Sequence, residues 1–241
     1  MRKNKMMRTA SGLLVATLLT TSVISGTFAK YTTAASGKDS ARVAKFGVTI
    51  TTTGDMFKDE YATDDTDVAK AGIITKSVIT SGAAGDAVVA PGTSGTLAKA
   101  AITGTPEVAV RVAYEPTLTL DGWKDGKNKE YCPIVFKVNG VTYGLNGMKD
   151  AAGTVVTNPS DSIADLQTAV EGAIKAYSKD YAPKTDLSEK TGEYIDVSWE
   201  WAFDKNDDAK DTHLGDCAAD TDTTNDSKVE LSVKTTVTQI D

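Results

Sequence analysis

Alternation of apolar and polar residues predicts β-strands along most of the chain. The clearest pattern covers residues 194–203, where one face carries Ile195, Val197, Trp199, Trp201 and Phe203. Because Trp199 and Trp201 share that face with aliphatic residues, we expect them in the core and not in a carbohydrate-stacking platform. Similar alternation predicts a first strand over residues 42–53, a second over 71–80, a third through Val108, Val110 and Val112, and a last one over 228–240.

Two dipeptides indicate turns between these strands. Asn139–Gly140 lies between two apolar stretches, which is the strongest short-range signal for a β-hairpin. Pro91–Gly92 separates two extended runs, because proline presets the first turn dihedral and glycine accepts positive φ. The acidic stretches 54–67 and 204–226 have no apolar period, so we expect them to be surface loops.

One segment, at about residues 160–179, has helical spacing instead. Its apolar positions are Ile163, Leu166, Val170, Ile174 and Tyr177, and Ser160 or Ser162 can act as N-cap. Many strands, one helix and long loops predict an all-β fold. We expect a jelly roll or β-sandwich with this amphipathic helix inserted.

The first 29 residues are typical of an export signal. Arg2, Lys3, Lys5 and Arg8 precede an uncharged run that ends in SGTFA, which predicts cleavage between Ala29 and Lys30. The alternative is a retained membrane anchor, but Thr, Ser and Gly interrupt the apolar run, whereas a span needs about 18 or more apolar residues. We therefore expect a signal peptide over 1–29, a flexible segment over 30–42 and a single β-domain over 43–241.

Charge and cysteine content narrow the expected partners. Removing the leader takes away four positive charges and changes the formal net charge from −7 to −11, so nucleic acid and anionic membrane surfaces are not expected partners. A membrane contact is expected only through the uncleaved signal. Cys132 and Cys217 are the two cysteines. They could form a disulfide outside the cytoplasm or remain two buried free thiols in distant elements, and the sequence leaves both alternatives open.

Groups for catalysis are scarce. His213 is the single histidine, so a zinc helix of the HExxH type and multi-histidine sites are excluded, and no serine has a nucleophile-elbow motif around it. We expect no enzyme and no cofactor other than calcium. The candidate calcium ligands are Asp204, Asn206, Asp208 and Asp211, whose oxygen side chains alternate as in calcium loops, although a glycine and a twelfth-position glutamate are missing. The alternative is an acidic loop without metal.

Several of these segments resemble the TasA/camelysin family of exported Gram-positive proteins. The matching pieces are SGTFAKYTT at the signal junction, DSARVAKFGVTI at the first strand, VVAPGTSGTL with EVAVRVAYE after it, and the terminal YIDVSWEWAF and VELSVKTTVTQID. The resemblance implies a secreted jelly-roll protein, processed by a SipW-type signal peptidase, that forms extracellular fibres of a biofilm matrix. Some members are labelled metallopeptidases, an activity we do not carry over because the histidines are missing.

In that family, assembly can proceed by donation of the N-terminal segment to the neighbouring subunit, which here assigns the donor role to residues 30–42. The implied partners are further copies of the chain and other proteins of the matrix or cell surface. Two other functions stay open at this point. One is a monomeric cell-surface ligand-binding module or adhesin that uses the acidic loops, with or without calcium. The other, less favoured, is a secreted hydrolase, which would use His213 or a pair of carboxylates that the sequence does not single out.

Overall fold

The computed structural model describes residues 42–52, 56–58, 60–63, 77–80, 87–219 and 226–240. The predicted signal peptide, its cleavage site at Ala29 and Lys30, and residues 30–41 of the predicted donor segment lie outside these ranges. Contacts divide the chain into residues 1–43 and 44–241, and the description below concerns the second unit.

Strands dominate this unit, which confirms a mostly β protein. Strand makes up 37% of the described residues and helix 20%. One larger sheet has the order β10-β6-β12, with strands Lys179–Tyr181, Val110–Asp121 and Lys228–Gln239. The other has the order β4-β11-β7-β8-β9, with strands Ser94–Thr96, Val197–Trp201, Ile134–Val138, Val141–Leu145 and Asn158–Ser160. Two smaller pairs join β1 (Thr49–Thr51) to β5 (Ala101–Thr103) and β2 (Glu60–Thr63) to β3 (Ser77–Thr80).

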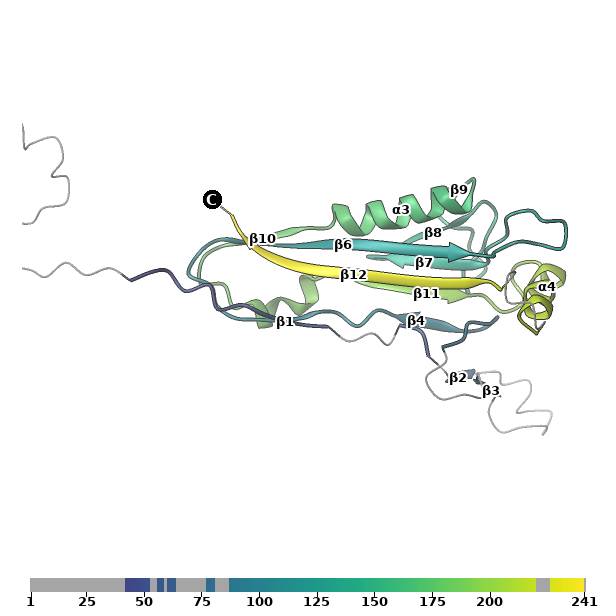
Figure 1. Cartoon of the computed structure of the whole chain (residues 1–241), viewed down its shortest axis with the longest axis horizontal. Coiled ribbons are helices and arrows are strands. Elements are labelled where there is room, and N and C mark those ends of the chain that lie inside the picture. Colours follow the sequence, from purple (N-terminus) through teal and green to yellow (C-terminus); the bar gives the residue numbers. More distant parts are fainter. Residues whose placement is uncertain are drawn as a thin grey trace, which may run out of the picture. The chain divides into compact units, whose positions relative to one another are not determined.

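The longest pairing is the antiparallel ladder between β6 and β12. It runs from Lys228 opposite Asp121 to Gln239 opposite Val110 without a bulge (Figure 1). The last predicted strand is therefore confirmed over nearly its full length. The first predicted strand is shorter than expected. Residues 42–48 have no regular structure and only β1 pairs, because Gly47 adopts a φ of +45° that interrupts the extended backbone.

The predicted hairpin and helix are both present. Val138 faces Val141 across the turn, and Asn139 and Gly140 have φ values of 49° and 82°, as a two-residue hairpin with right-handed twist requires. Helix α3 spans Ile163–Ala176, and its N-cap is Ser162, whose side chain accepts a hydrogen bond from the Asp165 N–H. The helix lies along β6 and also contacts β7, β8 and β9 (Figure 1).

Two predicted loops contain regular structure. Within the stretch 204–226, residues Asp208–Ala219 form helix α4, and within 54–67, residues Glu60–Thr63 form β2. A short 3₁₀ helix, η2, follows α3 at Leu187–Glu193. The expectation of a single helix was therefore wrong. Helix α4 escapes pattern analysis because its buried residues are only Asp211 and Leu214, so no apolar stripe repeats along it. Among the described residues, no helix is long and apolar enough to span a membrane.

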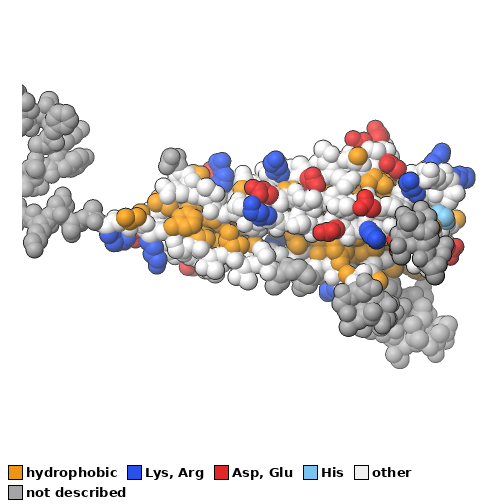
Figure 2. Space-filling model, in the orientation of Figure 1, with side chains coloured by type: hydrophobic (Ala, Val, Ile, Leu, Met, Phe, Trp, Pro, Cys, Tyr) orange, Lys and Arg blue, Asp and Glu red, His pale blue; other side chains and the backbone are white. Residues whose placement is uncertain are grey.

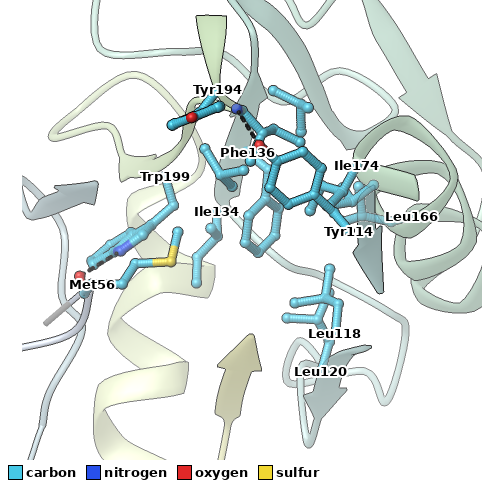
Figure 3. Close-up of a cluster of buried hydrophobic side chains, with 14 of the residues drawn as sticks. Met56, Tyr114, Leu118, Leu120, Ile134, Phe136, Leu166, Ile174, Tyr194 and Trp199 are labelled. Carbon is cyan, nitrogen blue, oxygen red and sulfur yellow. Dashed lines mark hydrogen bonds between the residues drawn. The ribbon is translucent and has the colours of Figure 1, made fainter. Parts of the chain in front are cut away.

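Both larger sheets and α3 contribute to one hydrophobic core. Figure 3 shows Tyr114, Leu118 and Leu120 of β6 in the same cluster as Ile134 and Phe136 of β7 and Leu166 and Ile174 of α3. The predicted core position of Trp199 and Trp201 is confirmed, with exposed fractions of 1% and 5%. Phe203 was expected on the same buried face but is 63% exposed, because β11 ends at Trp201.

Candidate functional site

The outer side of β12 is the largest unpaired feature of the described sheets. β12 is bonded to β6 on one side, and no described strand lies on its other side. The core-facing side chains of β6 opposite it are mostly buried. Those of β12 are only half-buried, namely Val229, Leu231, Val233, Thr235 and Val237.

Hydrogen bonds at Leu118 establish which way the backbone of β12 points. The Leu118 N–H donates to Glu171 Oε1 at 2.7 Å, and its carbonyl accepts from Gln167 Nε2 at 2.7 Å, so both groups point away from β12. Leu118 faces Leu231 in the ladder. Bonded and non-bonded pairs alternate in antiparallel sheets. Every second residue of β12 from Val229 to Gln239 therefore points its N–H and C=O to the outer edge.

The outer backbone groups of β6 are covered by other elements, whereas no described element covers those of β12. On the β6 side, β10 covers Val110 to Val112, and α3 covers Leu118 through Glu171 and Gln167. Pro116 lies between them at a non-bonded position opposite Val233, where its missing N–H costs the β6–β12 ladder nothing. On the β12 side no such cover is present among the described residues. A long uncovered edge is a template for an additional strand.

A groove of about 200 Å³, lined by both apolar and polar residues, runs beside β12. One wall is Leu231, Ser232, Val233 and Thr235 of β12, and the other is Leu97 to Ala100, the segment between β4 and β5; the remaining lining residues are Thr52, Tyr114, Tyr194 and Ile195. Figure 2 shows apolar side chains in a band along the molecule where Figure 1 places β12 beside β1 and β4. We call this groove, with the outer edge of β12, the β12 groove.

Three polar side chains that line the β12 groove already have partners. The Tyr114 hydroxyl accepts from the Ile195 N–H at 3.1 Å, and the Tyr194 hydroxyl donates to the Leu187 carbonyl at 2.6 Å. Burial raises the pKa of Tyr114, and it raises the pKa of Tyr194 to about 12, so both phenols stay neutral near pH 7. Lys99 Nζ forms an ion pair with Asp196 Oδ2 at 3.5 Å. The groove therefore offers shape, apolar surface and free backbone groups.

The structure does not assemble the predicted calcium ligands into a site. Asp204 is exposed with its Oδ1 2.6 Å from Lys205 Nζ, and Asn206 Oδ1 accepts from the Lys149 N–H at 3.0 Å. Asp208 is exposed in the first turn of α4, and Asp211 is buried. Over the described ranges, no group of three or more His, Cys, Asp or Glu side chains is placed to hold a metal ion. Asp204 and Asn206 precede α4, whereas Asp208 and Asp211 belong to it, and Asp211 is turned into the core.

Asp211 has a structural role that sequence reasoning missed. Tyr131 donates to its Oδ1 at 2.6 Å and Trp201 Nε1 donates to its Oδ2 at 3.3 Å. Trp201 packs edge-on against Trp123 at 5.8 Å between ring centroids. Lys210 Nζ lies 5.0 Å from the Tyr131 ring centroid. These contacts fix α4 to the end of the core, and Tyr131 is 80 positions away from Asp211 along the chain.

The two cysteines are free and lie in different environments. Cys132 is fully buried, and burial raises the pKa of its thiol to about 12. Cys217 is half-buried on α4, with its Sγ 3.6 Å from His213 Nε2. Both thiols are thus free in the structure, but only Cys132 is buried as the second alternative expected.

Comparisons of the chain with models of protein families, with curated proteins and with solved structures find no match. Sequence reasoning identified β12 as a strand but missed the β12 groove. Its walls come from β12, β6 and the segment before β5, which the sheet topology brings together.

Proposed function

We propose that this protein is a secreted structural protein that assembles into extracellular fibres or biofilm matrix by strand addition at the β12 groove. The incoming strand is the N-terminal segment, residues 30–42, of another copy. The observation that carries the proposal is the outer edge of β12, a 12-residue strand whose alternate backbone groups point away from β6. Added strands satisfy such groups with main-chain hydrogen bonds.

Length and side-chain size favour this occupant. Cleavage after Ala29 would leave residues 30–42 ahead of the domain, about as many residues as β12 contains. The groove has a volume of only about 200 Å³, and the segment offers small side chains around Ala34, Ala35 and Ser36. It contains no proline, so every residue can donate to a ladder. Its polar residues would add little burial, so main-chain hydrogen bonds would supply most of the affinity.

The resemblance to the TasA/camelysin family supports the same proposal. It is on this basis that we propose the finer architecture, a jelly roll or β-sandwich closed by α3 on one side and open at the β12 groove on the other. Export through a SipW-type signal peptidase and a location in the matrix or at the cell surface belong to the same proposal. It requires no catalytic group.

Separate removal of donor and acceptor tests the proposal. The mature chain, residues 30–241, is expected to form fibres visible by electron microscopy, and the chain lacking 30–42 is expected to stay monomeric in sedimentation. Thr235→Pro removes one outward N–H of β12 and keeps the β6 ladder, so it should also abolish fibres. Thr235→Val keeps that N–H and is the matched control.

A mixture of the two defective chains gives the sharpest result. The chain without residues 30–42 retains the acceptor and Thr235→Pro retains the donor, so together they should form a 1:1 dimer that does not elongate. A mature chain that is monodisperse at all concentrations would overturn strand addition. Fibres that persist in Thr235→Pro would remove β12 as the acceptor, whatever the donor is.

A further inference from the structure

His213 and Cys217 form a pair of metal-ligating side chains on the exposed part of α4. They are four positions apart, so they lie on the same face of the helix, one turn from each other. His213 Nε2 is 3.6 Å from Cys217 Sγ, and both side chains are half-buried. The β12 groove does not include either residue.

The separation of the two atoms matches that of two ligands on one tetrahedral ion. Zinc binds sulfur at about 2.3 Å and imidazole nitrogen at about 2.0–2.1 Å, which at a tetrahedral angle places the two ligand atoms about 3.6 Å apart. Two ligands at i and i+4 on a helix are also the arrangement with which zinc helices hold their metal. The distance between Nε2 and Sγ is therefore already the one that a shared ion requires.

The imidazole of His213 lies beside Gly126. A Cβ added at Gly126 would be in ordinary van der Waals contact with the ring, 3.6 Å from Nδ1 and 3.8 Å from Cε1. Nδ1 therefore faces Gly126, while Nε2 faces the thiol.

We propose that His213 and Cys217 form a two-ligand site for a thiophilic metal ion of the Zn²⁺ class. Thiolate and imidazole select such ions over calcium and magnesium, which prefer oxygen. The thiol releases its proton to solvent when the ion binds, so affinity falls as pH falls. Water or ligands from another molecule complete the coordination, because the described residues contain no group of three ligands. This proposal is independent of the fibre proposal.

Co²⁺ is the probe, because thiolate coordination gives it an intense near-ultraviolet absorption. Titration of the reduced mature chain should produce this band with one ion per chain, and Zn²⁺ should remove it. Zn²⁺ should also raise the melting temperature, since an ion that binds the folded state stabilises it, and chelator should reverse the rise. The band should disappear in Cys217→Ser. In His213→Ala the affinity for Co²⁺, measured from the same band, should fall at least tenfold.

Asp216→Asn is the control, because Asp216 is exposed on the same helix and carries a carboxylate between the two ligands in sequence. It should bind Co²⁺ as the original chain does. Circular dichroism of each variant establishes that α4 still folds. Absence of the thiolate band in the original chain, or its persistence in Cys217→Ser, would overturn the site. Unchanged affinity in His213→Ala would do the same.

Discussion

Trp199 Nε1 donates a hydrogen bond of 3.1 Å to the carbonyl oxygen of Met56, and the bond passes beside the Cα of Gly95 (Figure 3). A Cβ at Gly95 would lie 2.0 Å from that oxygen and 2.6 Å from the indole nitrogen. A glycine in β4 thus makes it possible for residues 56–58 to contact the core. The contact buries Met56 to 4% exposure.

Gly95→Ala is expected to destabilise the fold. The new methyl group must displace Met56 and break the buried hydrogen bond, which should lower the free energy of unfolding by about 2–3 kcal/mol. Urea denaturation followed by tryptophan fluorescence measures the change. Gly172→Ala is the matched control, because nothing lies within 4 Å of its added Cβ in α3, and it should raise stability by up to about 1 kcal/mol. Equal stability of both variants would show that the Met56 contact is not formed.

Glu171→Ala combined with Gln167→Ala should uncover the second edge of the β10-β6-β12 sheet. Leu118 would lose both backbone partners, and we expect a loss of roughly 1–3 kcal/mol together with new self-association. Denaturation and light scattering measure the two effects. Thr168→Ala is the control, because its hydroxyl bonds only within α3, to the Ala164 carbonyl. If light scattering does not change in the double variant, Glu171 and Gln167 do not prevent association at the β6 edge.

Asp211→Asn tests the buried carboxyl by its pH dependence. Burial raises the pKa of Asp211, against the hydrogen bonds from Tyr131 and Trp201 that lower it. The folded state therefore holds that proton more tightly than the unfolded chain. The stabilisation is complete below the unfolded pKa of about 3.9 and is lost as pH rises through the folded pKa.

Relative to Asp211→Asn, the original chain should thus be more stable near pH 4 than near pH 8. Denaturant midpoints at a series of pH values measure this difference. Asp208→Asn makes the same charge change at an exposed position of α4, and its midpoints supply the reference. A difference that grows in the opposite direction would mean that the buried carboxyl is better stabilised as the ion.

Thiol labelling separates the two cysteines. Cys217 is half-buried and Cys132 is fully buried with a thiol pKa of about 12, so a thiol reagent at pH 8 should modify one thiol in the native protein and two in denaturant. Mass spectrometry of peptides identifies the modified residue. No reaction before treatment with reductant, followed by two thiols after it, would instead indicate a disulfide between them.

Sequence patterns predicted the strands and the helix that bury one face and therefore repeat apolar residues at the period of that element. Residues from Val197 to Trp201 alternate because β11 has one buried face, and Ile163, Leu166, Val170 and Ile174 repeat because α3 has one buried stripe. Asn139–Gly140 predicted its hairpin for a local reason, since both residues tolerate positive φ.

The missed features depend on contacts that are distant in sequence. Asp211 holds α4 to the core, and hydrogen bonds from Tyr131 and Trp201 satisfy its buried carboxyl group. No pattern within residues 208–219 indicates these two partners. The alternation over 228–239 predicts a strand but does not tell whether a neighbour lies on one side or both. The β12 groove therefore required the sheet order.

The ladder between β6 and β12 also sets an order of events during synthesis. β12 begins at Lys228, and its partner β6 begins more than 100 residues earlier, at Val110. A chain grows from its N-terminus, so the proposed donor segment emerges before the proposed acceptor edge. A nascent chain can offer a donor strand before it has a β12 to receive one. On the proposed mechanism, chains without β12 cannot join one another through this edge, and one that binds a fibre end cannot extend the fibre further.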